Sequence, residues 1–449
     1  MLKQKRIQEI YFNFLLIITP VCCLLGNLTI NILILFILLG GLFFFKTRLF
    51  KINLKENNLY IITLFFAFII LSTFFNLLQD GEHEDYIKSI FFLKYFLLIL
   101  TVNFLLREGI INLKYLLLSS FICSMFVASE VIFQYFINKK EVVYNSTIFG
   151  EENIAGGYIQ RFGVLGVLSL IIFFKNKKPW FNFFTLFLFL FYILAVILSG
   201  NRMPLIMFLL SLLLFGFFLK NFRIPILMSF IILSVVGYIF WSLVDRDKNI
   251  IKNRYLSFYN NAVNIIPNVA LELSKGDYPE LQNKKDEPFV EYWHKGERDQ
   301  YEIIPSGSMH VIVYITSIDL WKDSKLIGSG IKSFRVNCLD KLHLPNRVCS
   351  NHPHNYYLEI MNDSGLIGFA LFVFAAILLL WKNLKLLNQR NVHENKVLFL
   401  IILSALISFF VEIFPLRSTG SFFSTSSGFY IFLLFSILFG SENLLKKKI

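Results

Sequence analysis

The sequence predicts an all-α membrane protein that crosses the bilayer many times, and two observations support this fold class. Apolar residues make up 56% of the 449 residues, and the mean hydropathy is +0.63. Apolar runs of about 20 residues, the length that spans a bilayer as a helix, recur along the chain. The formal charge of +13 needs no nucleic acid to explain it, because basic loops beside anionic lipid produce such an excess.

The expected spans are windows of about 20 apolar residues, and there are about twelve of them. They cover residues 10–26, 27–45, 58–78, 88–106, 115–137, 157–174, 180–199, 203–219, 224–244, 365–381, 396–414 and 427–440. The first two windows precede residue 60, so the N-terminus is expected to be a retained span and not a cleaved signal peptide.

Positive residues predict the orientation of these spans, because cytoplasmic connections carry an excess of Lys and Arg. Basic clusters precede the first span, follow every second span and end the chain, whereas the connection "QDGEHEDY" is acidic. Both termini are therefore expected to be cytoplasmic.

A polar segment of about 120 residues interrupts the apolar pattern after the ninth span and is far longer than an ordinary connection. The chain is thus expected to form a membrane bundle (1–244), a loop with short helices (245–364) and a second bundle (365–449). Counting spans places the loop on the exoplasmic side. Any chemistry is therefore expected outside the cytoplasm, at the membrane surface.

Cys338 and Cys349 both lie in this loop, in a compartment that tolerates disulfides. A bridge between them would stabilise the loop by about 3 kcal/mol. Together with His343 and His352 they could instead bind zinc, but the usual close ligand pairs are only partly present. The disulfide is the preferred interpretation, and no metal is expected. Nucleotide-binding motifs are also lacking, so no cofactor is expected.

The stretch "HPHNYYLEIMNDSG" (352–365) places two histidines directly before the tenth span. It predicts a short amphipathic helix at the membrane surface, starting near Pro353 and ending at Gly365. His354 and Asn355 would then lie at the mouth of the bilayer. Because imidazole titrates near neutral pH, His354 could act as a general base toward a hydroxyl; alternatively, it is one of the many inert histidines at membrane interfaces.

Three arginines are expected on the same exoplasmic side. Arg202 lies in the turn "SGNRMP" between two strongly apolar spans, where a cation is usually avoided. Arg161 and Arg254 lie close to other span ends. Guanidinium groups bind phosphate oxygens in pairs, so converging arginines would suit a diphosphate. Arg161 and Arg254 could instead reach phospholipid headgroups, for which the turn at Arg202 leaves little room.

Charged residues also occur inside predicted spans, at Lys94, Glu130 and Glu412. Charges at that depth are costly and are functional candidates by default. They could pair with one another or mark a cavity.

Four stretches resemble the O-antigen ligase and polymerase superfamily of bacterial envelope glycosyltransferases. They are "FGEENIAGGYIQRF" (149–162), "SGNR" (199–202), "DLWKDSKLIGSGIKSFRVNC" (319–338) and "HPHNYYLEIMNDSGLIGF" (352–369). The last is the most specific, because a His-Asn pair before a Leu-containing helix and Gly-Leu-x-Gly is the family's signature. The resemblance implies a GT-C-like fold with a cavity that receives glycan linked to undecaprenyl diphosphate.

The resemblance also implies roles for two residues. Arg202, the arginine of the "SGxR" turn, is expected to hold the diphosphate. His354, the histidine of the His-Asn pair, is expected to take the proton from the acceptor hydroxyl as it attacks the anomeric carbon. Transfer would be metal-independent and inverting, at the periplasmic face of the bacterial inner membrane.

Further substrate contacts are expected from His352, Asn355, Arg161 and His310. His310 occupies a place where family members often carry a basic residue. Arg254 is therefore the candidate for a second phosphate-binding cation.

Two activities within the family share this donor: ligation of glycan onto lipid A-core and polymerisation onto a growing glycan. Protein O-glycosylation is a third. The ligase is the preferred interpretation. A transporter or flippase of lipid-linked glycan is the alternative of another class, but such proteins usually show two similar halves, and the loop after the ninth span breaks that symmetry.

Overall fold

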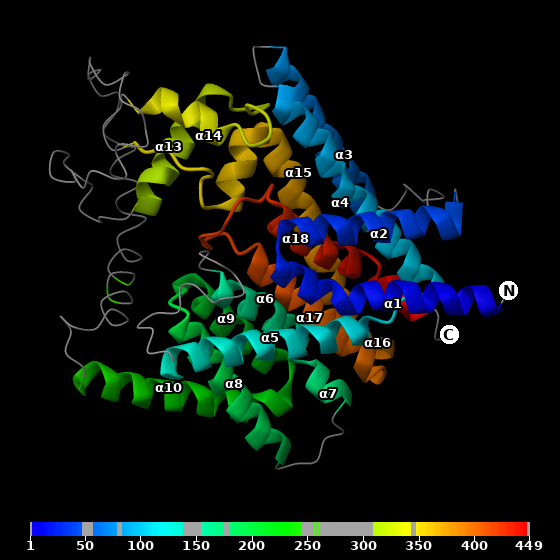
Figure 1. Ribbon diagram of the computed structural model, residues 1–449, viewed down its shortest axis with the longest axis vertical. Helices are drawn as coiled ribbons and strands as arrows, with labels where there is room; N and C mark the ends of the chain where they lie inside the picture. The colour runs from blue at the N-terminus through cyan, green and yellow to red at the C-terminus, as the bar shows by residue number, and fades with distance from the viewer. Residues whose placement is uncertain are drawn as a thin grey trace.

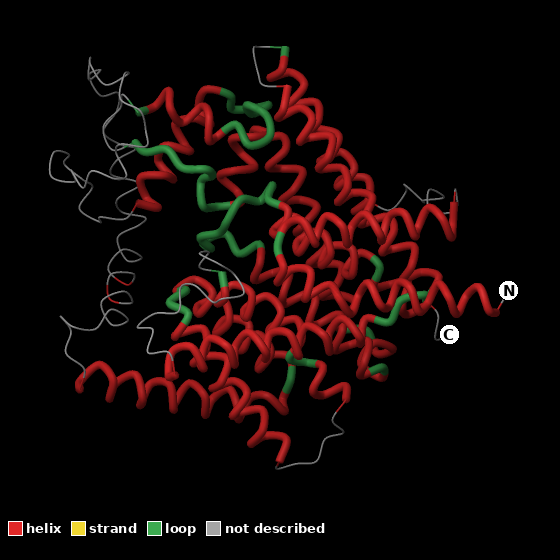
Figure 2. The backbone as a smooth tube through the Cα atoms, viewed as in Figure 1, coloured by secondary structure: helices red, strands yellow, loops and turns green. Residues whose placement is uncertain are grey.

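The computed structural model describes residues 2–46, 57–78, 83–137, 154–173, 180–243, 256, 259, 309–342 and 347–446. Within these residues the chain is helical, with loops and turns between the helices and no strand (Figure 2). Most of residues 245–308 of the predicted loop, and residues 343–346, fall outside the described residues. Arg254 and His343 are among them.

The first group of helices precedes the large loop (Figure 1). They are α1 (Leu2–Leu25), α2 (Asn27–Phe45), α3 (Asn57–Leu77), α4 (His83–Glu108), α5 (Leu113–Ile137), α6 (Ala155–Gly166), α7 (Ser169–Phe173), α8 (Trp180–Leu198), α9 (Arg202–Phe218) and α10 (Arg223–Leu243). The second group follows it. They are α13 (Met309–Asp323), α14 (Phe334–Asn337), α15 (Tyr356–Leu387), α16 (Arg390–Glu394), α17 (Lys396–Glu412), α18 (Thr425–Phe439) and α19 (Ser441–Lys446).

Nine candidate membrane spans occur among the described residues, each long and apolar enough to cross a bilayer. The chain is therefore a multi-pass membrane protein of the all-α class. The windows predicted at 203–219, 396–414 and 427–440 coincide with α9, α17 and α18, which have 17, 17 and 15 residues. The expected total of twelve crossings stays a prediction, because these three helices are shorter than the nine candidate spans.

An aromatic cluster joins four helices beneath the start of α15. Phe372 of α15 lies 5.5 Å from Phe65 of α3 and 5.0 Å from Phe422, measured between ring centroids. Phe422 also lies 6.2 Å from Phe92 of α4 and 5.9 Å from Phe432 of α18. Rings that pack at such distances combine a large buried apolar area with favourable edge contacts. The cluster thereby fixes α15 relative to α3, α4 and α18.

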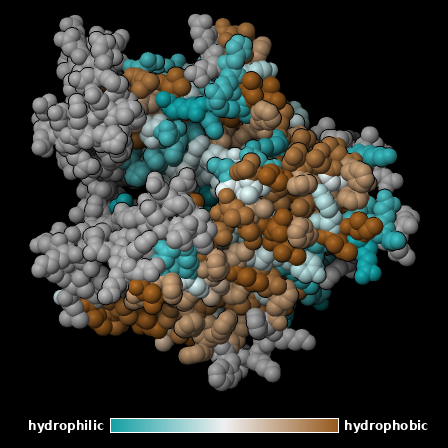
Figure 3. Space-filling model, in the orientation of Figure 1, coloured by the Kyte–Doolittle hydropathy of each residue, from teal (hydrophilic) through white to brown (hydrophobic). Residues whose placement is uncertain are grey.

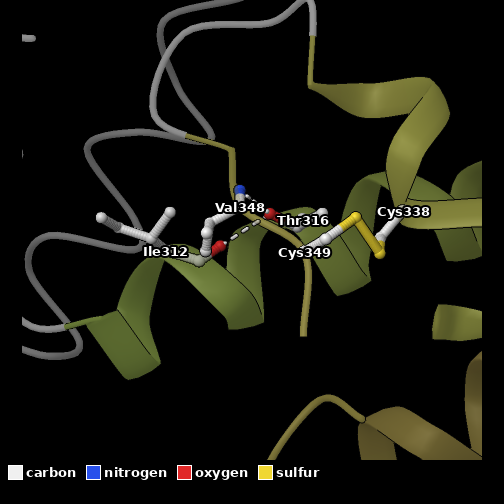
Figure 4. Close-up of a disulfide and its surroundings, with 5 residues drawn as sticks. All are labelled: Ile312, Thr316, Cys338, Val348 and Cys349. Carbon is white, nitrogen blue, oxygen red and sulfur yellow. Dashed lines mark hydrogen bonds between the residues drawn. A yellow bond between two sulfur atoms is a disulfide. The ribbon is translucent and has the colours of Figure 1, made fainter. Parts of the chain in front are cut away.

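A disulfide between Cys338 and Cys349 ties the chain after α14 to the chain before α15, with a Cα–Cα distance of 5.3 Å (Figure 4). Both sulfurs belong to a small apolar cluster with Val313, Leu320 and Phe334. Because the two cysteines are bonded to each other here, their thiolates do not form the zinc site considered from the sequence. The bridge anchors the chain three residues before His352.

The segment 325–333 lies against the first part of α15, at residues 362–367, through backbone hydrogen bonds. Ser329 N donates to Asn362 O (2.8 Å), and Gly330 N donates to Asp363 O (2.9 Å). The helix is interrupted at Gly365, whose φ is 62°. A Cβ atom at this position would lie 2.2 Å from the carbonyl oxygen of Leu326. Only glycine fits both the left-handed conformation and the close approach.

Hydropathy differs between the two ends of the molecule in Figure 3. Hydrophobic residues cover the lower part, over α8 and α10, whereas hydrophilic residues gather in the upper part near α13 and α14. Both α13 and α14 pack against α15, so this polar region lies beside the start of α15, where His354 is the candidate general base.

Candidate active site

The helix that follows the histidines begins at Tyr356 and not at Pro353, which corrects the predicted start. Asn355 is its N-cap: the side-chain Oδ1 accepts hydrogen bonds from the backbone N–H groups of Tyr357 (3.0 Å) and Leu358 (3.2 Å). Such a cap satisfies two donors that the first turn of a helix leaves unpaired. Asn355, and not Pro353, is therefore the residue that starts the helix.

The prediction of an amphipathic surface helix is wrong for residues 356–365. Glu359, Asn362 and Asp363 are all buried. Glu359 accepts hydrogen bonds from Ser421 Oγ and Phe422 N, each at 2.5 Å. The polar side of the helix thus faces other parts of the protein, which supply hydrogen-bond donors in place of water.

Three histidines from two segments form a cluster in front of α15. The ring centroid of His354 lies 4.3 Å from that of His352 and 5.0 Å from that of His310, which belongs to α13. His354 Nε2 lies 3.3 Å from Ser350 Oγ. His310 Nδ1 and His352 Nε2 are buried and have no hydrogen-bond partner. Among the described residues, no group of three or more His, Cys, Asp or Glu side chains could hold a metal ion.

Burial keeps this cluster uncharged at neutral pH. Desolvation lowers the pKa of His352 to about 4, with a smaller contribution from the neighbouring His354. The pKa of His310 is also lowered to about 4, first by desolvation, then by His354 and Arg202. Desolvation lowers the pKa of His354 as well. A neutral imidazole has a lone pair to offer, so the electrostatics suit a proton acceptor.

The backbone of His354 has an unusual conformation. Its φ is 57°, in the left-handed region that residues other than glycine rarely adopt. The carbonyl oxygen of His354 accepts a hydrogen bond from the backbone N–H of Thr419 at 2.8 Å. Residues held in this way cluster at functional sites, where the surrounding structure imposes the conformation.

Arg202 is the first residue of α9, directly after the turn that contains Gly200 (φ 70°). It lies close enough to His310 for its positive charge to lower the pKa of that imidazole. The structure therefore brings together Arg202 and the histidines, which the sequence separates by more than a hundred residues.

Arg161 pairs with side chains of other helices. Its Nε and Nη2 donate to the two carboxylate oxygens of Glu412 at 3.0 and 2.6 Å, and Nη2 also lies 3.2 Å from Tyr356 Oη. The guanidinium lies over the ring of Tyr430, with 5.4 Å between the guanidinium carbon and the ring centroid. Arg161 thus forms a bidentate ion pair with Glu412, one of the charged residues noted within the predicted spans.

The other charges noted within predicted spans also have partners. Lys94 Nζ donates to Asn31 Oδ1 at 2.7 Å, and Glu130 accepts a hydrogen bond from Gln134 at 2.6 Å. Pairing of this kind offsets the cost of a polar group inside the membrane.

Sequence reasoning missed Arg417, which is buried and donates to Glu412 Oε2 at 2.7 Å. A signal was present: Arg417 lies in "FPLRSTG", a connection expected to be exoplasmic, and a cation there is as unusual as at Arg202. Glu359 was missed because one acidic residue in an amphipathic pattern looks solvent-exposed.

Residues 186–373 match the family model described as O-antigen ligase. The match supports the O-antigen ligase and polymerase superfamily that the four sequence stretches resemble. Arg202 and the three clustered histidines lie inside the match, whereas Arg161 and Glu412 lie outside it. No curated protein matches the chain.

The match to the O-antigen ligase family supports an enzyme of the glycosyltransferase-like ligase and polymerase type. Lipid-linked glycans and membrane embedding, which the family implies, agree with the multi-pass bundle. The candidate active site therefore lies at one end of α15, where the histidines and Arg202 meet.

Proposed function

We propose that the protein is an O-antigen ligase: a glycosyltransferase that moves glycan from undecaprenyl diphosphate to lipid A-core at the periplasmic face of the inner membrane. The observation that carries the proposal is the convergence of Arg202 and a neutral His354 in front of α15, within the part of the chain that matches the O-antigen ligase family. A cation and a base together are what transfer from a diphosphate requires.

The proposed step is a single displacement at the anomeric carbon. The acceptor hydroxyl oxygen forms a bond to that carbon while the bond to the diphosphate oxygen breaks, so the configuration inverts. His354 takes the hydroxyl proton. Arg202 neutralises the negative charge that grows on the leaving diphosphate, for which a guanidinium is well shaped. No step in this scheme uses a metal ion or a redox cofactor.

The lowered pKa of His354 fits this role. A base must be unprotonated before reaction, and a group whose pKa lies below neutral is ready at physiological pH. His352 and His310, which touch the same ring, are also neutral and do not repel the proton that His354 gains.

The test is transfer of glycan from undecaprenyl diphosphate to purified lipid A-core by the purified protein, with a chelator present. Wild type should form glycosylated lipid A-core, and His354→Ala should retain only a small residual rate of transfer. His83→Ala is the matched control, because His83 is exposed at the start of α4. Lengthening of the donor glycan would make the protein a polymerase. Full transfer by His354→Ala would remove this histidine from the mechanism.

A further inference from the structure

We propose that Glu412 is a positioning residue for His354. In this scheme Glu412 fixes the segment 413–419 between α17 and α18, and the backbone of that segment holds the His354–Asn355 pair in its reactive geometry. The inference rests on the proposed function, because it takes His354 as the base.

Glu412 connects three parts of the structure. Its side chain is 0% exposed and pairs with Arg161 of α6 through both carboxylate oxygens. Oε1 also accepts a hydrogen bond from Tyr356 Oη at 2.9 Å, at the first residue of α15. Oε2 accepts from Arg417 Nη1 at 2.7 Å, within the segment that follows α17. One carboxylate thus joins a membrane helix, the helix behind the histidines and the segment 413–419.

The segment 413–419 in turn contacts the His-Asn pair directly. Asn355 Nδ2 donates to Pro415 O at 2.8 Å, and Thr419 N donates to His354 O at 2.8 Å. Tyr357 Oη also donates to the carbonyl oxygen of Ile413. These contacts hold both residues of the pair and the first turn of α15.

His354 needs such support because of its backbone. With φ at 57°, it occupies a conformation that a residue with a Cβ atom leaves when nothing restrains it. The hydrogen bond from Thr419 restrains its carbonyl, and Asn355 restrains the next residue. If the segment 413–419 shifts, the imidazole moves away from the acceptor hydroxyl.

Charge explains why Glu412 controls this segment. Arg161 and Arg417 have side chains that are 18% and 6% exposed, so two cations share one buried carboxylate. Neutralising Glu412 leaves these cations to repel each other with little screening by water. Arg417 belongs to the segment 413–419, so the repulsion acts on the segment that restrains His354.

The experiment measures kcat and KM for the undecaprenyl-diphosphate donor in the transfer assay above. Glu412→Gln keeps the shape of the side chain and removes its charge. Its kcat should fall about 100-fold with little change in KM, the size expected when a reactive group is displaced by about 1 Å. The matched control is Glu394→Gln, which neutralises an exposed pair with Arg390 and should behave as wild type.

Two additional variants separate positioning from other roles. Adding Glu412→Gln to His354→Ala should cause no further loss, because the effect passes through His354. Thr419→Pro removes the N–H that bonds His354 O without touching the charges, and it should lower kcat in the same way. If Glu412→Gln does not fold, an unchanged kcat for Thr419→Pro still overturns the proposal, because this variant removes the hydrogen bond through which Glu412 is proposed to act on His354.

Other results overturn the proposal. An unchanged kcat for Glu412→Gln, or a rise in donor KM alone, would show that Glu412 does not position the base. Further loss in the double variant would show that it acts independently of His354. If His354→Ala itself retains full transfer, the proposed function fails; an inactive His354→Ala beside a fully active Glu412→Gln rejects only the positioning role.

Discussion

Acidification should destabilise this protein through its histidine cluster, and His352→Gln is the perturbation that isolates the effect. The pKa of His352 is lowered from 6.5 to about 4 in the folded protein, mainly by burial. Between these values the unfolded chain binds a proton that the folded protein does not. The stability that comes from this difference is therefore present above pH 6.5 and is lost as the pH falls toward 4.

The size of the effect follows from the shift. Each pKa unit corresponds to 1.36 kcal/mol, so the complete effect of His352 is about 3 kcal/mol. At pH 5, part of the way through the range, about 2 kcal/mol has been lost. For a chain of this length that lowers the unfolding midpoint by about 2 °C. His310, whose pKa is lowered to about the same value, should contribute a similar amount.

The assay is thermal unfolding of the detergent-purified protein from pH 7.5 to pH 5. The midpoint of wild type should fall by about 2 °C more than that of His352→Gln over this range, and adding His310→Gln should about double the difference. His393→Gln is the control, because His393 is exposed on α16. Parallel curves for wild type and His352→Gln would refute the reasoning, since they would mean that this imidazole titrates alike in folded and unfolded protein.

Two other predictions concern the donor site and the break in α15. Arg202→Lys should lose most glycan transfer, because an ammonium cannot make two parallel bonds to a phosphate; Arg390→Lys, at an exposed arginine, is the control, and equal donor turnover in both would make Arg202 a surface anchor. Gly365→Ala should lower the free energy of unfolding by more than about 2 kcal/mol, since its Cβ would meet Leu326 O at 2.2 Å and its φ is 62°. Thermal unfolding beside Gly157→Ala, where a Cβ would meet nothing within 4 Å, checks this, and similar midpoints would contradict it.

Several parts of the fold could be predicted because they depend on local composition. A bilayer offers no hydrogen bonds to the backbone. A run of about 20 apolar residues therefore forms a helix, in which the backbone groups bond to one another. Each predicted window accordingly coincides with described helices. The predicted surface helix at residues 356–365 was wrong because an amphipathic pattern does not show what covers its polar side. Other protein segments, and not water, cover that side.

The candidate site residues could be proposed from the sequence, whereas their geometry could be predicted only in part. Arg202 stands out because a cation is unusual in such a short exoplasmic turn, and the His-Asn pair stands out because it resembles the family signature. Asn355, expected to bind substrate, has an additional structural use as a helix cap that the sequence could have suggested from its place before an apolar helix.

By itself, the sequence determined the membrane class and the approximate helices, and it supplied the candidate residues for accepting a proton and binding phosphate. Only the tertiary structure decided that His310 joins His354, and that Arg161 pairs with Glu412 across 251 residues of sequence. The physical reason is that these distances depend on how separate helices pack, which local composition does not encode. The left-handed backbone of His354 likewise depends on a hydrogen bond from Thr419, a residue of another segment.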